Sequence, residues 1–185
     1  MSEINERLDR LRALVQDQDF LDGKGLSNEV NIRIFCYDAK DEMTVRHFVK
    51  QQKADQTLSC HLIEYNLYQL FLSICDDMGI MDEIPDMEQT QGKGYLFEQM
   101  CYIATERAFV QKMQYGPHES GDVLMLTGVG EVFPFMRIHS LLEALQPYFS
   151  DIPILVLYPG VFDGRHVKLF NKLQPNDYYR AFNIV

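Results

Sequence analysis

The side chains best suited to acid–base or metal chemistry lie in two segments of the C-terminal half of the chain. Arg137 and His139 form one pair, and Asp163, Arg165 and His166 follow later. Imidazole and carboxylate groups bind metals such as zinc and transfer protons near neutral pH. A single histidine or an Asp-Gly turn more often has a structural role, and no zinc-protease, nucleophile-elbow or Cys/His motif accompanies these residues. We therefore predict no catalytic residue, no metal ligand and no enzymatic activity.

A pair of glycines, Gly128 and Gly130, raises the question of phosphate binding. A phosphate-binding loop needs the pattern G-x-x-x-x-G-K-[ST] after a strand, and the sequence lacks it. A dinucleotide fingerprint needs a third glycine at the position of Phe133. Asp38 follows the first expected strand, and no glycine accompanies it to let backbone amides surround a phosphate. The sequence therefore predicts no bound nucleotide or other cofactor.

The glycine pair lies between two strands that we expect to be buried. Residues 123–127 and 154–158 are unbroken apolar runs. Such runs are typical of parallel strands that are covered on both faces. Between them, four residues share one helical stripe that is spaced to pack on a sheet: Ile138, Leu141, Leu142 and Leu145. Strand, helix and strand in this order predict a right-handed crossover.

The rest of the chain supplies further elements of the same kind. We expect strands over 31–37, 60–65 and 178–185, and helices over 3–17, after Asp38, after Asn66, over 95–113 and through Val167, Phe170 and Leu173. This alternation predicts an α/β fold, a three-layer sandwich around a mostly parallel sheet of about five strands. It resembles a nucleotide-binding core without a phosphate loop. We expect one domain over 1–185, with an N-terminal amphipathic helix within 1–20.

Residues 80–92 form an acidic connector in this scheme. The segment contains Asp82, Glu83 and Asp86. A solvated loop is the favoured interpretation, and docking to a basic partner is the alternative.

The carboxyl ends of parallel strands gather at one edge of a sheet, where open α/β sheets bind their ligands. Asp38, Thr127, Gly128 and Gly130 are expected at this edge, beside Pro159-Gly160. Two interpretations stay open. The turns form a crevice for a ligand or partner, or the glycines only permit tight turns between strand and helix.

Charge and composition restrict the classes of partner. The formal net charge of −10 disfavours direct nucleic-acid binding, which depends on neutralising phosphates. No apolar run reaches the length of a membrane span, and the charged N-terminus is unlike a signal peptide. We expect a cytoplasmic location, with the four cysteines as buried free thiols.

Three stretches are specific in combination: GLSNEVNIRIFCYD (25–38), LTGVGEVFPFMRIHSLLEALQP (126–147) and LYPGVFDGRHVKLFNKLQPNDYYRAFNIV (157–185). Together they resemble the BrxB family, the small component of bacteriophage exclusion (BREX) defence systems. The resemblance covers essentially the whole chain. It rests on T-G-V-G…F-P-F-x-R-x-H-x-L-L joined to Y-P-G…D-G and Y-Y-R-A-F.

The resemblance implies a bacterial cytoplasmic protein encoded among a DNA adenine methyltransferase, a large ATPase and the alkaline-phosphatase-like protein PglZ. Such systems methylate host DNA and block replication of phage DNA. The family has no established catalytic residues to carry over. Its marks in this sequence are candidates for ligand or partner binding: Arg137, His139, Asp163, Tyr178, Tyr179 and Arg180.

The leading hypothesis is a non-catalytic adaptor that binds another BREX protein, most plausibly PglZ. We expect no association with a membrane. Tyr178, Tyr179 and Arg180 suit an interface hot spot, unless Arg180 pairs with an acid inside the protein. A second hypothesis is a small-ligand or nucleotide sensor that uses the crevice. A third is direct nucleic-acid binding, which the charge disfavours.

Overall fold

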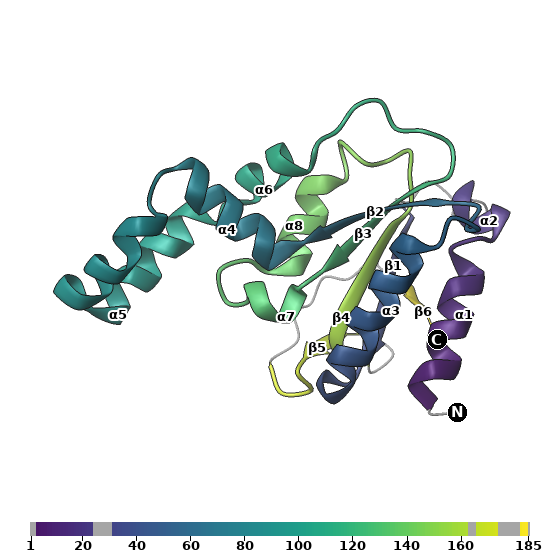
Figure 1. The fold of residues 1–185 in the computed structure, drawn as a ribbon, viewed down its shortest axis with the longest axis horizontal. Helices are drawn as coiled ribbons and strands as arrows, with labels where there is room; N and C mark the ends of the chain where they lie inside the picture. The colour runs from purple at the N-terminus through teal and green to yellow at the C-terminus, as the bar shows by residue number, and fades with distance from the viewer. Residues whose placement is uncertain (1–2, 24–30, 163–165, 174–181, 185) are drawn as a thin grey trace.

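A computed structural model describes residues 3–23, 31–162, 166–173 and 182–184. Its centre is a sheet in which five strands run parallel in the order β2-β3-β4-β1-β6 within the described part of the chain (Figure 1). A further short strand, β5, pairs antiparallel with β4. The strands are β1 (Ile32–Tyr37), β2 (His61–Asn66), β3 (Asp122–Thr127), β4 (Ile154–Phe162), β5 (Val167–Leu169) and β6 (Phe182–Ile184). The predicted mostly parallel sheet is confirmed.

The sheet is covered on both faces because successive residues of its central strands point to opposite sides. Phe35 of β1 packs with the helices of one face, whereas its neighbour Ile34 packs with those of the other. One face carries α1 (Glu3–Leu14) and α3 (Glu42–Ala54), and the opposite face carries α4 (Leu67–Asp77), α6 (Glu106–Met113) and α8 (Ile138–Leu145) (Figure 1). This arrangement is the expected three-layer sandwich.

The order of the strands creates a crevice at their carboxyl ends. The chain crosses from β1 over two strands to β2 and then returns through β3 to β4. Right-handed crossovers in opposite directions place their helices on opposite faces of the sheet. The helices that follow β1 and β3 therefore diverge, and ligands of open α/β folds bind at such a reversal.

Short helices join the larger elements. They are α2 (Gln18–Leu21), the 3-10 turns η1 (Ala39–Asp41) and η2 (Met81–Glu83), and α7 (Val129–Val132). Three of the four cysteines are buried, and Cys101 is half-buried, so the expected free thiols are present.

The acidic segment 80–92 is helical, and its prediction as a loop is wrong. It contains η2 and the first half of α5 (Ile84–Ile103). Pro85 lies in the first turn of α5, where its missing N–H costs nothing. Met81, Ile84 and Met87 recur every three residues and pack on the core. Gly92 interrupts α5 with a φ of 86°, a left-handed conformation that glycine tolerates.

Two further predictions need correction. The expected helix 95–113 divides after Ile103, because Thr105 caps α6 by accepting a hydrogen bond from the amide of Ala108 at 3.2 Å. The expected helix through Val167, Phe170 and Leu173 is wrong, since Val167–Leu169 form β5 with alternating burial. Phe170 and Asn171 have φ angles of 53° and 60°, which do not continue a helix.

Strand predictions at the C-terminal end were close but incomplete. β4 extends to Phe162, four residues beyond the expected end at Tyr158, because it pairs with β5. Residues 182–184 of the expected last strand form β6 beside β1. Positions 178–181 of that prediction lie outside the described residues.

Candidate functional site

The strand-end crevice contains two adjoining cavities. A cavity of about 300 Å³ opens between α3 and the ends of β2 and β3, with Glu64, Asn66 and Thr127 in its wall. A neighbouring cavity of about 170 Å³ lies at the ends of β1, β3 and β4, lined by Gly130, Pro159 and others. Gly128 contributes to both cavities. The crevice thus lies where the strand order predicts it.

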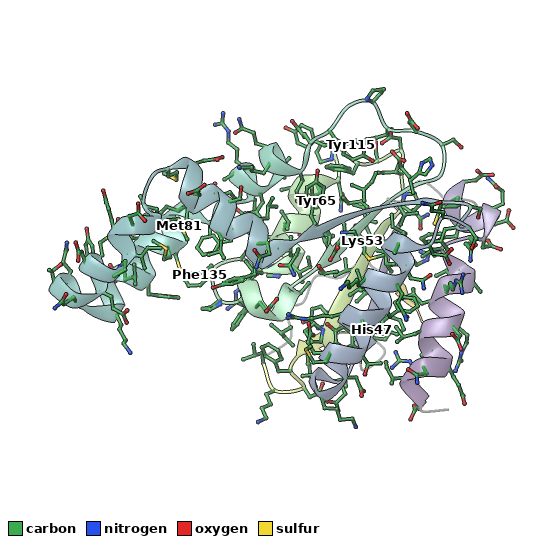
Figure 2. The ribbon with its side chains drawn as sticks, in the orientation of Figure 1. His47, Lys53, Tyr65, Met81, Tyr115 and Phe135 are labelled. Atoms are coloured by element: carbon green, nitrogen blue, oxygen red, sulfur yellow. The ribbon has the colours of Figure 1, made fainter. Side chains whose placement is uncertain are left out.

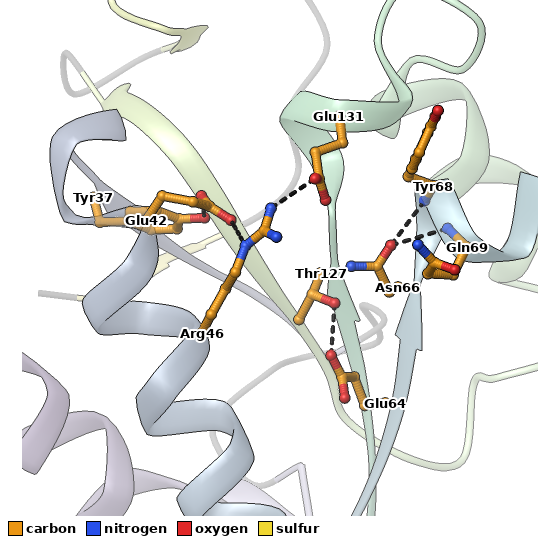
Figure 3. Close-up of polar contacts among 9 residues, drawn as sticks. All are labelled: Tyr37, Glu42, Arg46, Glu64, Asn66, Tyr68, Gln69, Thr127 and Glu131. Atoms are coloured by element: carbon orange, nitrogen blue, oxygen red, sulfur yellow. Dashed lines mark hydrogen bonds and ion pairs between the residues drawn. The ribbon is translucent and has the colours of Figure 1, made fainter.

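An arginine holds two acids together across this crevice (Figure 3). The Nε of Arg46 on α3 donates to Glu42 at 2.7 Å, and its guanidinium reaches Glu131 of α7 at 2.8 Å. The hydroxyl of Tyr37 donates to the second oxygen of Glu42 at 2.6 Å. These four residues connect the first turn of α3 with α7, the two elements that diverge at the crevice.

The electrostatics of this cluster favour fixed charges. Burial raises the pKa of Tyr37 well above its ordinary value, and the hydrogen bond to Glu42 raises it further. The hydrogen bonds from Arg46 to Glu131 and to Glu42 raise the pKa of the guanidinium. A neutral phenol and a permanently charged arginine stabilise the structure, but neither is poised to transfer a proton near neutral pH.

A second polar group lines the larger cavity on the β2 side. Thr127 donates its hydroxyl hydrogen to Glu64 at 2.8 Å (Figure 3). The ammonium of Lys53, at the end of α3, contacts the other oxygen of Glu64 at 2.7 Å. Lys50 also lines this cavity. The wall therefore combines cationic side chains with two carboxylates, Glu42 and Glu64, each of which already has two partners.

The glycines of the turn are required by close packing. The side-chain oxygen of Asn66 caps α4 by accepting from the amides of Tyr68 and Gln69 at 3.1 and 3.0 Å. Gly128 has a φ of 69°, and a Cβ there would lie 2.6 Å from that same oxygen. A Cβ at Gly130 would lie 2.7 Å from the ring of Phe170. These contacts support the interpretation that the glycines permit a tight turn.

The structure separates the residues that the sequence grouped. Thr127, Gly128 and Gly130 line the crevice, as expected. Asp38 is exposed and caps η1 by accepting from the amide of Lys40 at 3.0 Å, and the walls of both crevice cavities are formed without it.

Arg137 and His139 lie elsewhere. They line a small cavity of about 40 Å³ with Phe133 and Tyr158, beside α8. The guanidinium of Arg137 is 5.6 Å from the ring centroid of Phe133, within cation–π range. Burial, and after it the charge of Arg137, lowers the pKa of His139. A histidine kept neutral here is consistent with a structural role.

The remaining predicted site residues lie outside the described part of the chain: Asp163, Tyr178, Tyr179 and Arg180. Their proposed roles stay predictions. Within residues 3–23, 31–162, 166–173 and 182–184, no three His, Cys, Asp or Glu side chains are grouped closely enough to hold a metal ion.

Several polar residues of the crevice were missed from the sequence. Glu42 and Arg46 are four residues apart on a helix, a spacing that indicates an ion pair and was available in the sequence. Glu64 and Glu131 gave no such signal, because their partners Lys53 and Arg46 come from other elements.

A further cluster, at the amino ends of β2 and β3, was also missed. Asp122 is buried and accepts hydrogen bonds from the amide of Glu119 and the hydroxyl of Tyr115, both at 2.9 Å. Its other oxygen lies 3.2 Å from Nδ1 of His61. Burial raises the pKa of Asp122, but these contacts outweigh it, and the net shift is downward. The cluster fastens the loop before β3 to the start of β2.

Comparisons with known proteins place this architecture in a family. The family model described as "BREX protein BrxB" matches residues 63–184. A BREX protein BrxB from Bacillus cereus (strain H3081.97) is 33% identical over 190 residues, covering 100% of this chain and 99% of the relative. A BREX protein BrxB from Escherichia coli O9:H4 (strain HS) is 27% identical over 186 residues, covering 97% of this chain and 90% of the relative.

No solved structure gives a significant match to this chain. None of the described helices combines the length and the apolar character needed to cross a bilayer. The resemblance seen in the sequence is confirmed along its full length by the Bacillus relative. On the strength of the family model and of both relatives, the chain belongs to the BrxB family.

Proposed function

We propose that this BrxB-family chain serves BREX phage defence as a non-catalytic adaptor in the bacterial cytoplasm. In this role it binds another BREX protein, PglZ, in support of host DNA methylation and phage exclusion. The observation that carries the proposal is the state of the crevice. Where related folds hold reactive groups or phosphates, the Arg46 guanidinium is bound by Glu42 and Glu131, and Tyr37 is bound by Glu42. Side chains that bind one another in this way hold two elements in place rather than act on a substrate.

The adaptor hypothesis is tested by tagging this chain and co-expressing it with the other BREX proteins of its operon. We expect PglZ to co-purify in a fixed ratio that survives size-exclusion chromatography. Deletion of the chain should abolish phage resistance, and a copy supplied in trans should restore it. Recovery of the tagged chain alone, from cells that contain every other component, would contradict the adaptor role.

The second hypothesis, a small-ligand sensor, is favoured by one observation. The cavity of about 300 Å³ is large enough for a small molecule, and Arg46, Lys50 and Lys53 line it. A nucleotide is disfavoured, because Asn66 and Phe170 occupy the space beside Gly128 and Gly130 into which a phosphate would have to fit. Titration calorimetry with ATP and GTP, with and without magnesium, tests the nucleotide form of this second hypothesis. Micromolar, magnesium-dependent binding would favour the sensor.

A further inference from the structure

A helical arm extends from the body of the protein and carries surface that the body does not cover. We define this acidic arm as residues 76–103, which comprise the end of α4, η2 and α5. In Figure 1 it points away from the sheet, on the side opposite α1 and α3. Of the 20 residues of α5, only Met100 is buried. Gly92 divides α5 into two shorter helices. A helix on the surface of a domain ordinarily buries a continuous stripe.

One side of the arm is held by contacts with the body. Met81, Ile84 and Leu96 pack at the margin of the core. The ring of Phe97 lies 5.8 Å from that of Phe135, which lies near the base of the arm (Figure 2). These contacts hold the arm against the body. They also stabilise its helices, because short isolated helices are only marginally stable in water.

The opposite side of α5 presents aromatic rings to solvent. Tyr102 is 78% exposed and Tyr95 is 39% exposed. The two tyrosines are seven residues apart, so they lie on the same side of the helix, with Glu98 between them. Met78, at the end of α4, is 58% exposed. Tyrosine is enriched among the residues that dominate binding energy at interfaces, since its ring buries a large area and its hydroxyl keeps a hydrogen bond.

The arm is strongly acidic. It contains seven acidic side chains and a single basic one, Lys93, so its net charge is −6, compared with −10 for the whole chain. Within the part of the chain that the structure describes, two of these acids form ion pairs, Asp77 with Lys112 and Glu88 with Lys93. The acids are Asp76, Asp77, Asp82, Glu83, Asp86, Glu88 and Glu98.

This charge decides among the classes of occupant. A second copy of the chain would bring another acidic arm, and like charges at an interface cost affinity. Nucleic acids and anionic membrane surfaces are repelled for the same reason. A protein surface with Lys and Arg around an apolar groove complements both the charges and the tyrosines.

We propose that the outward face of α5, centred on Tyr95 and Tyr102, docks the BREX partner through an apolar groove with a basic rim on that partner. The inference rests on the proposed adaptor function and assigns it a surface. The acids of the arm steer and align the partner, and the two tyrosines supply most of the affinity.

The experiment measures the equilibrium affinity of the full-length chain for purified PglZ of the same operon. The double variant Tyr95→Ala/Tyr102→Ala is expected to weaken binding about 30-fold or more. The triple variant Asp82→Lys/Asp86→Lys/Glu88→Lys is expected to weaken it at low salt, with a smaller deficit at high salt because salt screens exposed charges. The melting temperature of each variant should stay within a few degrees of the wild type.

Matched controls remove similar groups from other surfaces. Met43→Ala on α3 and Tyr148→Ala after α8 replace side chains that are 73% and 52% exposed. Glu3→Lys/Asp9→Lys reverses charge on the exposed side of α1. All three controls are expected to bind like the wild type.

The outcomes separate the inference from the function on which it rests. If PglZ binds the wild type and both arm variants equally, the arm is not the docking surface, and the adaptor role stands. If the wild type binds neither PglZ nor any other BREX protein of the operon, the proposed function fails and the inference fails with it. If the arm variants instead dissolve a homodimer seen by light scattering, the occupant is a second copy and the proposal is overturned.

Discussion

Two helices of this protein differ in how much of themselves they bury. α8 has eight residues and buries four of them, Ile138, Leu141, Leu142 and Leu145. α5 has twenty residues and buries one. Both carry apolar side chains, but α8 lies flat on the sheet and α5 extends from it (Figure 1). The difference shows that apolar residues in a helix indicate a face that is buried in some assembly. They do not indicate whether the same chain or a partner protein buries that face.

The polar side chains of the crevice, unlike the exposed side chains of the arm, have partners within the chain. Its Tyr37, Glu42, Arg46 and Glu131 bind one another. At the place where ligands bind in related folds, these polar side chains are thus engaged in internal contacts, and the uncovered surface lies on an extension of the fold. The comparison predicts that substitutions of buried residues in the body lower stability, and that substitutions of exposed residues on the arm affect binding alone.

The largest difference is expected between Leu141→Ala and Tyr102→Ala. Leu141 is completely buried, so its truncation leaves a cavity and should lower the free energy of unfolding by about 2–5 kcal/mol. Tyr102 is 78% exposed, and its truncation should change that free energy by no more than about 0.5 kcal/mol. Urea denaturation followed by circular dichroism measures both. A loss at Tyr102 as large as that at Leu141 would mean that the arm is part of the folded core.

Glycine substitutions should distinguish body and arm by a smaller amount. A Cβ at Gly160 would lie 2.2 Å from the backbone oxygen of Lys168, so Gly160→Ala must displace β5. We expect a loss of about 1–3 kcal/mol, as for other overpacked sites. Gly94 in α5 has open space around it, and Gly94→Ala should be neutral or stabilise the helix by up to about 1 kcal/mol. Thermal unfolding of the two variants compares them directly. Equal losses at both positions would show that the arm is packed as tightly as the sheet.

The cluster at the amino ends of β2 and β3 should make the stability of the body depend on pH. Contacts hold the pKa of Asp122 below its ordinary value of 3.8, so the carboxylate contributes stability above that pH. The contribution is lost as the pH falls below about 3.8 through the lower pKa of the folded state. Asp122→Asn should cost about 1–3 kcal/mol at neutral pH, and its curve of stability against pH should meet that of the wild type in acid. A constant difference at every pH would assign the loss to packing.

Much of the body could be predicted from the sequence, because its signals are local. The apolar runs at 123–127 and 154–158, and the stripe from Ile138 to Leu145, each specify an element from neighbouring residues alone. The turn residues Thr127, Gly128 and Gly130 were placed at the crevice by the same argument.

What the sequence missed depends on contacts between distant segments. Val167–Leu169 form a strand because they pair with the last residues of β4. Glu64 and Glu131 reach the crevice because Lys53 and Arg46 approach from α3. The acidic segment 80–92 was predicted to be a loop because of its many charges. Its helices depend on the contacts that Met81 and Ile84 make with the core, which the local sequence does not reveal. Arg137 and His139 were candidates for ligand or partner binding without a predicted location, and the structure places them in a separate small cavity beside α8.

The smallest expected effect concerns the ion pairs that span the crevice. Arg46→Gln removes the contacts to Glu42 and Glu131 and leaves two carboxylates at opposite sides of the crevice. Arg46 and Glu131 are 44% and 40% exposed in their side chains, so solvent screens them and the loss of stability should be only about 0.2–1 kcal/mol. The loss should shrink at high salt, because screening already weakens the pairs in the wild type. Lys40→Gln is the matched control, since its 3.8 Å pair with Asp38 is more exposed and does not connect diverging elements. If these ion pairs have a structural role alone, Arg46→Gln should bind PglZ as tightly as the wild type, whereas the tyrosine variants of the arm should not. A loss of binding in Arg46→Gln, with stability preserved, would move the docking surface from the arm to the crevice.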